Sequence, residues 1–245
     1  MKKVFNIGHQ GAKGHYRGNT IRSIKIGKME KCDVIEVDVR KTKDDIFVLY
    51  HDMDFKLFSK ETLGFKETQI EKCNYIELFE NGIVSMSEAL DCILMKAIPY
   101  LDVKIEGEYE NDIEYIENFI KLFSEKLKEY PDKIIFIASF NKTFIKKIAK
   151  INTQNNLLYG FLYENDDKIS DEEIESKLYH FYGFEKGMEI LKNNWKKLKK
   201  NDKLIFVYTI NILEELKEYF NKNYIDGIVT DFPDKLHSLK KLKQD

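Results

Sequence analysis

Short apolar runs rich in β-branched residues alternate along the chain with longer segments whose apolar residues recur every three or four positions. The first pattern predicts buried strands and the second predicts amphipathic helices. The predicted strands are the ranges 4–8, 34–39, 46–50, 99–105, 133–139, 157–163, 178–184, 203–210 and 225–231. The predicted helices are the ranges 19–30, 85–96, 111–130, 142–150, 185–200 and 211–222. We expect Asn19 or Thr20 to cap the first of these helices and Ser87 to cap the second.

The alternation of strands and helices predicts βαβ units and therefore a parallel sheet. If 46–50 is a short accessory strand, about eight strand–helix units remain, which favours a closed (β/α)8 TIM barrel over an open doubly wound sheet. A length of 245 residues suits a single barrel domain over 1–245. The segment at about 53–84 lacks a long periodic face, and we expect it to be a short insertion that shapes the pocket or forms a lid.

Composition narrows the class of protein. Hydrophobic residues make up 43% of the chain, and the charged residues nearly cancel to a net charge of −2, so nothing favours nucleic acid or an anionic membrane as a partner. The three cysteines are widely spaced, which argues against a disulfide framework and a zinc site and favours reduced thiols in the cytoplasm. The amino-terminal apolar stretch is too short for a signal peptide, and no run of about 18 apolar residues occurs, so we expect no stable membrane anchor. The oligomeric state stays open.

Two predicted strands carry carboxylates. Glu36 and Asp38 are two residues apart and therefore share one face of their strand, and Asp102 and Lys104 repeat this spacing on the next main strand. In a barrel, such pairs meet near the carboxyl-terminal rim, where three gathered carboxylates repel unless a cation holds them. Oxygen ligands without cysteine favour Mg²⁺ or Ca²⁺. We hypothesise that Glu36, Asp38 and Asp102 hold a divalent cation; the alternative is ion pairs with Lys104 and Arg40, or exposure on an edge strand.

Two of the five histidines are expected at the same rim, because His9 follows the first predicted strand and His51 follows the range 46–50. A pair of histidines beside a cation suits phosphodiester cleavage: one attacks or acts as a base, and the other protonates the leaving oxygen. A single loop histidine is more often incidental, but the carboxylates nearby favour catalysis. We expect His51 to be the general acid and Tyr208, near the rim, to stack on a substrate.

The segments around these residues resemble the glycerophosphodiester phosphodiesterase family, whose members are (β/α)8 barrels. The family's opening His-Arg-Gly and Glu-Asn-Thr block is similar to "GHQGAKGHYRGNTIRSI", and its Glu-x-Asp and His-Asp block is similar to "DVIEVDVRKTKDDIFVLYHD". Later blocks are similar to "PYLDVKIE", "FIASFN" and "FVYTINILEEL…IDGIVTDFPDKL". The resemblance covers nearly the whole chain.

The resemblance implies a role for each residue singled out above. The three carboxylates correspond to metal ligands, the two histidines to the catalytic pair, and Lys104 to a phosphate contact. The implied reaction is metal-dependent cleavage of a small glycerophosphodiester-type substrate to an alcohol and a phosphomonoester or cyclic phosphate, a reaction of lipid metabolism. The ending, with Thr230, Asp231 and Pro233, is interpreted as structural closure of the barrel.

The chain departs from the family pattern at the rim. Family members usually carry Arg where this chain has Gln10, and Gln supplies neither the charge nor the bidentate fork that binds phosphate. Lys13 and Arg17 are candidates to replace that charge at this substrate-binding position. The other departures are Gly18 in place of Glu, Asp102 in place of Glu, and Tyr208 in place of Trp. These changes affect the expected substrate more than the expected reaction.

Two other functions stay open. A phospholipase-D-like or glycan-phosphate diesterase acting on a larger substrate is motivated by the absent Arg and by the Asp-x-Lys pair, which also resembles the spider-venom sphingomyelinase D branch. A barrel that binds a phosphorylated ligand without catalysis is motivated by the lost Arg and Glu. Retention of both histidines opposes the second alternative.

Overall fold

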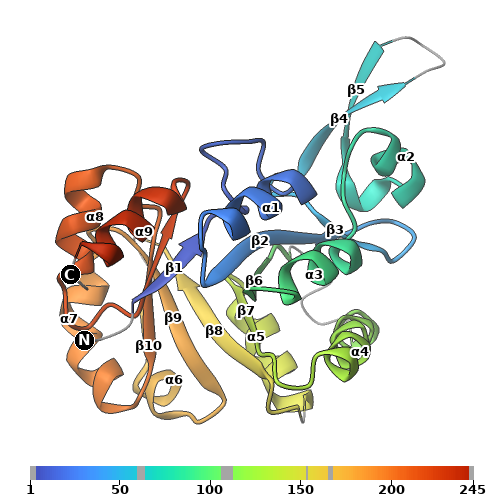
Figure 1. The fold of residues 1–245 in the computed structure, drawn as a ribbon. Coiled ribbons are helices and arrows are strands. Elements are labelled where there is room, and N and C mark those ends of the chain that lie inside the picture. The colour runs from blue at the N-terminus through green and yellow to red at the C-terminus, as the bar shows by residue number, and fades with distance from the viewer. Residues whose placement is uncertain (1–3, 60–63, 106–112, 153, 165–167, 243–245) are drawn as a thin grey trace.

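The computed structural model describes residues 4–59, 64–105, 113–152, 154–164 and 168–242. Within them, eight parallel strands form a closed ring, because β1 pairs with both β2 and β11 and every other strand pairs with its neighbours (Figure 1). The strands are β1 (Phe5–Gly8), β2 (Val34–Lys41), β6 (Ile98–Val103), β7 (Ile135–Ser139), β8 (Leu157–Tyr163), β9 (Tyr179–Glu185), β10 (Leu204–Tyr208) and β11 (Gly227–Thr230). The predicted (β/α)8 TIM barrel is confirmed.

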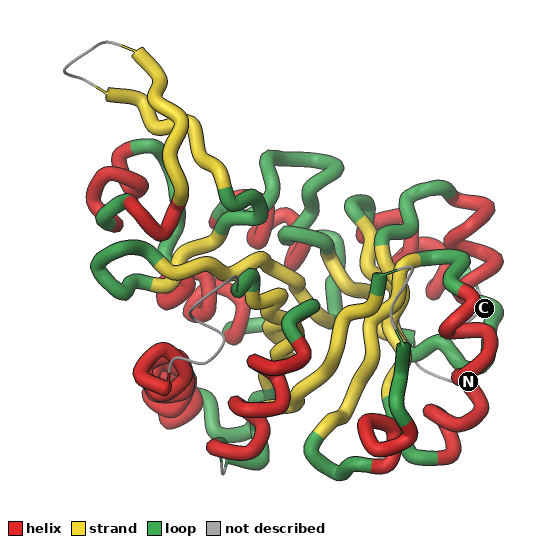
Figure 2. The backbone as a smooth tube through the Cα atoms, turned by 180° about the vertical axis from the view of Figure 1, so that it is seen from behind, coloured by secondary structure: helices red, strands yellow, loops and turns green. Residues whose placement is uncertain are grey.

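Helices cover the outside of this ring (Figure 2). They are α1 (Ile21–Met29), α3 (Met86–Leu94), α4 (Ile113–Glu129), α5 (Lys142–Ile151), α6 (Asp171–Glu175), α7 (Glu189–Lys200), α8 (Leu213–Phe220) and α9 (Pro233–Lys241). The six predicted helices are present, whereas α6 and α9 were not predicted; α6 is too short to show a helical period. Among the described helices, none has both the length and the apolar character needed to cross a bilayer.

The first residues of α1 and α3 are set by hydrogen bonds to the side chain of the residue that caps each helix. Thr20 caps α1, as predicted, with its hydroxyl accepting from the backbone N–H of Ser23. The prediction for α3 was wrong: Ser85 is the cap and accepts from the N–H of Glu88, whereas Ser87 lies inside the first turn. The cap has to precede the helix by enough for its side-chain oxygen to reach a free N–H of the first turn, and only Ser85 satisfies this.

Side chains alternate between the two faces of each strand, which creates two apolar layers. Val37 and Val39 point outward and join the large core between the sheet and the helices. Residues of the other face fill the barrel interior, with the aromatic rings of Phe136, Phe181 and Phe206 packed edge to face or tilted. This inner plug ends below the carboxylates, and the cavity that they line lies at the carboxyl-terminal rim.

The predicted accessory strand is β3 (Phe47–Leu49), which pairs antiparallel with β2. The segment after it forms a hairpin, β4 (Asp54–Ser59) and β5 (Gly64–Gln69), followed by the short helices η1 (Ile70–Lys72) and α2 (Tyr75–Glu80). The hairpin extends away from the barrel in both views (Figures 1 and 2). A separate small core that includes Phe55, Leu78 and Ile83 holds this segment against the barrel.

Candidate active site

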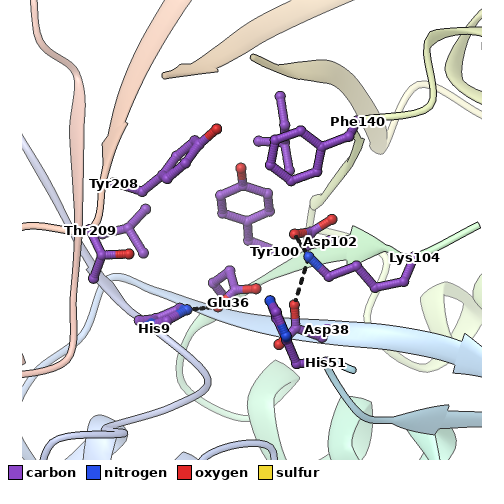
Figure 3. A pocket seen from close by; sticks show the side chains of 12 residues that line it. His9, Glu36, Asp38, His51, Tyr100, Asp102, Lys104, Phe140, Tyr208 and Thr209 are labelled. Atoms are coloured by element: carbon purple, nitrogen blue, oxygen red, sulfur yellow. Dashed lines mark hydrogen bonds and ion pairs between the residues drawn. The ribbon is translucent and has the colours of Figure 1, made fainter. Parts of the chain in front are cut away.

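A cavity of about 210 Å³ opens at the carboxyl ends of the strands (Figure 3), the edge where barrel enzymes carry their active sites. It brings together seven of the eight residues predicted for the site; the eighth, Gln10, lines a neighbouring cavity. The lining residues are His9, Glu36, Asp38, His51, Tyr100, Asp102, Lys104, Phe140, Leu162, Tyr208, Thr209 and Val229.

Glu36, Asp38 and Asp102 form the acidic floor of this cavity. Asp38 lies directly opposite Asp102 in the β2–β6 pairing, and Glu36 lies two residues earlier on the same face of β2. All three are buried, and one oxygen of each lies within 4.8 Å of the others. Oδ1 of Asp102 is buried without a hydrogen-bond partner among the described residues.

Two of the three carboxylates, Glu36 and Asp102, have a raised pKa. Burial, followed by repulsion from Asp38 and Asp102, raises the pKa of Glu36 well above its ordinary value. Burial also raises the pKa of Asp102 to about 6, although Lys104 opposes this effect. Full ionisation of the floor is therefore disfavoured unless further positive charge is bound there. Its donor set of hard oxygens, with one oxygen lacking a partner, fits a divalent cation such as Mg²⁺ or Ca²⁺.

Lys104 follows β6 and supplies part of the neutralising charge. Its Nζ atom lies 2.5 Å from Oδ2 of Asp102 and 3.2 Å from Oδ1 of Asp38. Burial lowers the pKa of Lys104, but these two carboxylates raise it above its ordinary value, so the ammonium stays charged. Together with a hydrogen bond from Asn19, the same ammonium holds the pKa of Asp38 below its usual value despite burial. The alternative interpretation, in which ion pairs neutralise the carboxylates, therefore applies to Asp38 and Asp102, which both pair with Lys104. Glu36 has no cationic partner at hydrogen-bond distance among the described residues.

His9 lies beside Glu36 and is held from behind by Asp231. Its Nδ1 atom is 2.6 Å from Oδ1 of Asp231, and its Nε2 atom is 4.0 Å from Oε2 of Glu36. Asn211 fixes Asp231 by donating to Oδ2 at 2.7 Å and accepting from the Asp231 backbone N–H at 2.9 Å. Burial raises the pKa of Asp231, but the hydrogen bond and charge of His9 bring it below its ordinary value. Asp231 therefore remains a carboxylate that accepts from Nδ1–H and leaves Nε2 directed at the cavity.

His51 occupies the opposite side of the carboxylates (Figure 3). Its Nδ1 atom lies 2.8 Å from Oδ1 of Asp52, and its backbone carbonyl accepts two hydrogen bonds from the guanidinium of Arg40. The His51 side chain is 55% exposed, compared with 19% for His9. The two histidines thus share one arrangement, a carboxylate at Nδ1, but His51 is open to solvent.

Gln10 is buried and contacts the acidic floor. Its backbone N–H donates to Oε2 of Glu36 at 2.8 Å, and its side-chain Nε2 donates to Oδ2 of Asp38 at 2.7 Å. The backbone of Gln10 has a left-handed φ of 48°. A Cβ atom at Gly18 would lie 2.2 Å from the Gln10 side-chain oxygen, so glycine at 18 makes room for this side chain. The two departures from the family pattern, Gln10 and Gly18, are therefore coupled sterically.

The roof of the cavity is aromatic. The rings of Phe140 and Tyr208 meet edge to face at 6.3 Å, and the buried ring of Tyr100 lies below them (Figure 3). The Tyr208 hydroxyl donates to the backbone carbonyl of Tyr163 at 2.7 Å, which fixes the ring in place. The site therefore combines an acidic floor with an apolar roof.

A second cavity, of about 450 Å³, lies on the other side of His51. It is formed by the loop between β1 and α1 and by the end of β3 with the residues that follow it. Its lining residues are Gln10, Lys13, Arg17, Gly18, Asn19, Leu49, Tyr50, His51, Asp52 and Ile83.

The sequence alone predicts for Asp231 only a structural part in closing the barrel. Gly8 does pair with Thr230 in the closing contact between β1 and β11, as expected. This pairing also places Asp231 beside His9. The signal was present, because in a closed barrel the residue after the last strand neighbours the residue after the first.

A closed barrel with an acidic cluster and two carboxylate-paired histidines at its rim is an arrangement suited to hydrolysis of phosphate esters. The model of the glycerophosphoryl diester phosphodiesterase family matches residues 9–235. The chain belongs to this family, which places it among the phosphoric diester hydrolases.

Individual relatives extend over almost the whole chain. A glycerophosphodiester phosphodiesterase of Bacillus subtilis strain 168 is 23% identical over 98% of this chain and 87% of its own length. The uncharacterized protein YqiK of the same strain is 27% identical over 98% of this chain and 99% of its own length. The structure of an Oleispira antarctica phosphodiesterase in complex with the product sn-glycerol-3-phosphate superposes with a TM-score of 0.80 at 20% identity, covering 98% of this chain and 97% of the other.

Proposed function

We propose that this chain is a metal-dependent phosphodiesterase that cleaves a glycerophosphodiester-type substrate to an alcohol and a phosphomonoester. The observation that carries the proposal is the meeting of three buried carboxylates and two carboxylate-paired histidines at one small cavity. A barrel that only bound a phosphorylated ligand would have no physical need to orient both imidazoles in this way. The proposal therefore assigns catalysis to the histidines.

The small cavity suits the glycerol phosphate part of the substrate. Its volume of about 210 Å³ lies below the range of about 300–1,000 Å³ of pockets for drug-sized ligands, so it fits a short alcohol. The rings of Phe140 and Tyr208 cover the carbon chain, while the phosphate faces the floor and Lys104. The product bound to the Oleispira antarctica phosphodiesterase, sn-glycerol-3-phosphate, has this size and charge.

The acidic floor supports the proposed metal requirement. When bound by Glu36, Asp38 and Asp102, a divalent cation supplies Lewis-acid neutralisation of the non-bridging phosphate oxygens. Lys104 adds a fixed positive charge beside the same oxygens, and it is held there by Asp102 and Asp38. Gln10 and Asn19 donate to Asp38 and keep this carboxylate oriented toward the cavity.

The two histidines divide the proton transfers. His9 Nε2, with Nδ1–H donated to Asp231, removes a proton from the attacking oxygen or attacks phosphorus itself. His51 protonates the leaving alkoxide as the bond between phosphorus and that oxygen breaks. His51 suits this role because it lines both cavities, so it stands where the alcohol leaves the small one.

Where His9 acts as the base, two nucleophiles satisfy this scheme. Water gives a phosphomonoester directly, with one P–O bond formed and one broken. The neighbouring hydroxyl of the substrate's own glycerol gives a cyclic phosphate first, and water opens the ring in a second step. Both routes end with the same alcohol and the same acid–base residues.

The experiment is turnover of glycerophosphocholine, glycerophosphoethanolamine and glycerophosphoglycerol by EDTA-stripped protein before and after Mg²⁺ or Ca²⁺ is restored. The proposal expects turnover of at least one diester only with the cation present. Turnover in EDTA at the same rate would contradict the metal requirement. Absence of turnover on every diester, larger glycan and lysophospholipid diesters included, would overturn the proposed activity.

A further inference from the structure

The second cavity carries positive charge at its entrance. Lys13 and Arg17 line it from the exposed loop between β1 and α1. Among the described residues, neither side chain forms an ion pair with a carboxylate, although the charge of Lys13 contributes to the lowered pKa of Asp231. The remaining charged group of the lining, Asp52, has one oxygen directed at Nδ1 of His51.

The other polar residues of this cavity are already engaged. Gln10 and Asn19 both donate their side-chain amides to Oδ2 of Asp38, at 2.7 and 2.8 Å. They are buried and therefore face the acidic floor rather than the entrance. Recognition of a ligand in this cavity is left to the two cations and to the ring of Tyr50, which lines the wall.

The position of the second cavity indicates which part of a substrate binds there. His51 separates it from the small cavity, and the alcohol protonated by His51 departs on this side. Its volume of about 450 Å³ is about twice the 210 Å³ of the small cavity, and falls within the usual range of ligand pockets. The leaving alcohol is therefore the larger part of the substrate.

We propose that the second cavity binds an anionic leaving alcohol, with Lys13 and Arg17 selecting diesters whose alcohol carries a further negative group such as a phosphate. This inference rests on the proposed function and names the substrate class of the same site. Lys13 and Arg17 line the second cavity and not the small one, so the proposal assigns them to the distal charge of the alcohol rather than to the phosphate that is cleaved. A cationic alcohol such as choline is disfavoured by the same charges.

The test compares three substrates that share the glycerol phosphate part: glycerophosphoglycerol phosphate, glycerophosphoglycerol and glycerophosphocholine. The expected order of kcat/KM follows the charge of the alcohol, with the anionic substrate fastest. Neutralising both cations, Lys13→Gln together with Arg17→Gln, is expected to lower kcat/KM for the anionic substrate by about tenfold, mainly through KM, and to leave the neutral substrate within about twofold. The preference also weakens as salt is added, because the charges are exposed.

The matched control is Lys25→Gln with Lys121→Gln, which removes two exposed charges from α1 and α4, away from both cavities. It is expected to leave the order of substrates unchanged. Binding is measured separately by calorimetry of glycerophosphoglycerol phosphate to His9→Ala protein with and without the two neutralising substitutions. A tenfold weaker affinity is expected there as well.

The outcomes distinguish failure of the anionic-alcohol preference from failure of the proposed phosphodiesterase activity. Equal kcat/KM for the three alcohols, with metal-dependent turnover, overturns the anionic alcohol and leaves the phosphodiesterase intact. Equal loss on all three substrates in the neutralised variant shows that Lys13 and Arg17 contact the cleaved phosphate, which also overturns the inference. Absence of turnover on every diester, with binding unaffected by the substitutions, removes the proposed function together with the inference.

Discussion

Nδ1 of His9 and Oδ1 of Asp231 lie 2.6 Å apart, joining the residues that follow the first and last strands of the barrel. The pair is largely buried, with 19% of each side chain exposed. The matching contact of His51 with Asp52 is 55% and 71% exposed, so its charge is screened by water. The carboxylate behind His9 therefore has the larger influence on its imidazole.

The first prediction is that Asp231→Asn lowers kcat by about 10²–10⁴ with little change in KM. The Asn side chain can donate to Nδ1, which would place the proton on Nε2 and prevent it from accepting one. The measurement is steady-state kinetics on the best diester, with Asp234→Asn, three residues further along the chain, as the control. A kcat within twofold of the unsubstituted enzyme would show that Asp231 serves only barrel closure.

The second prediction concerns stability without metal. Because burial and the neighbouring carboxylates raise the pKa of Glu36, its charged form costs stability at neutral pH. The contribution of Glu36 to the free energy of unfolding is fully present below the pKa that Glu36 has in the unfolded chain. It is lost as the pH rises through the higher pKa that Glu36 has in the folded protein. Glu36→Gln should therefore raise the stability of the metal-free protein at pH 7 by about 1 kcal/mol, or about 2–4 °C in Tm.

The same substitution should abolish the stabilisation that Mg²⁺ or Ca²⁺ gives to the unsubstituted protein, which at a hundredfold excess over Kd is about 2.7 kcal/mol. Thermal unfolding in EDTA and with added cation measures both effects. Glu77→Gln, in the exposed first turn of α2, is the control for removal of a carboxylate. An unchanged cation-induced shift in Glu36→Gln protein would contradict the proposed ligand set.

The third prediction follows from the steric coupling of Gln10 and Gly18. Gln10→Gly removes a donor to Asp38 and is expected to weaken cation affinity by about 10–100-fold. Gly18→Ala should give a similar loss by displacing the Gln10 side chain. The double variant Gln10→Gly with Gly18→Ala lacks the Gln10 Cβ atom, which would lie 2.8 Å from the new Cβ atom, and its loss should be smaller than the sum of the two single losses. Calorimetric titration with Mg²⁺ or Ca²⁺ measures all three. Additive losses would mean that the two residues act independently.

The family pattern adds a substitution to this series. Gln10→Arg introduces a charge where the chain lacks one, and we expect it to change the substrate preference or the affinity for phosphate. Kinetics on the full set of diesters provide the measurement. Identical kinetics on all of them would contradict a substrate-facing role for position 10.

The fourth prediction concerns pH and lies outside the active site. His180 is half-buried on β9 and its Nδ1 atom accepts from the backbone N–H of Tyr159 at 3.1 Å. Burial and the charge of Lys203 lower its pKa below the ordinary value of 6.5. Below pH 6.5 the unfolded chain therefore binds a proton at His180 more readily than the folded chain does. The contribution of His180 to the free energy of unfolding is fully present above pH 6.5 and is lost as the pH falls below it.

Denaturant unfolding between pH 5 and pH 8 tests this prediction by comparing the unsubstituted protein with His180→Asn. The Asn oxygen can accept from Tyr159 but has no proton to gain, so the variant should show a flatter pH profile in the acid limb. Parallel profiles for the two proteins would exclude His180 as the source of the loss.

The sequence predicted those parts of the site that depend on strand periodicity. Glu36, Asp38 and Asp102 share a face because side chains alternate along a strand, and parallel pairing then brought Asp38 opposite Asp102. His9 and His51 were predictable because both directly follow apolar runs. These inferences needed only local spacing and the barrel topology.

The remaining features of the site and the fold depend on contacts between segments that are distant in the sequence. The role of Asp231 required the register of the barrel closure, and the position of Gln10 required the space left by Gly18. The β4–β5 hairpin escaped prediction because residues such as Phe65 remain exposed, so its alternation does not separate a buried face from a solvent face. Side-chain packing across the fold decided all three features.

The most direct test of the central claim is phosphorus NMR of a single diester, glycerophosphoglycerol or its phosphate, mixed with EDTA-stripped enzyme to which Mg²⁺ or Ca²⁺ has been restored. We expect conversion to glycerol phosphate, directly or through a cyclic phosphate signal that rises and falls. We also expect the rate to drop by about 10²–10⁴ in His9→Ala and in His51→Ala protein, while both variants retain the cation-induced rise in Tm. Undiminished conversion in both histidine variants, or conversion that needs no cation, would contradict it.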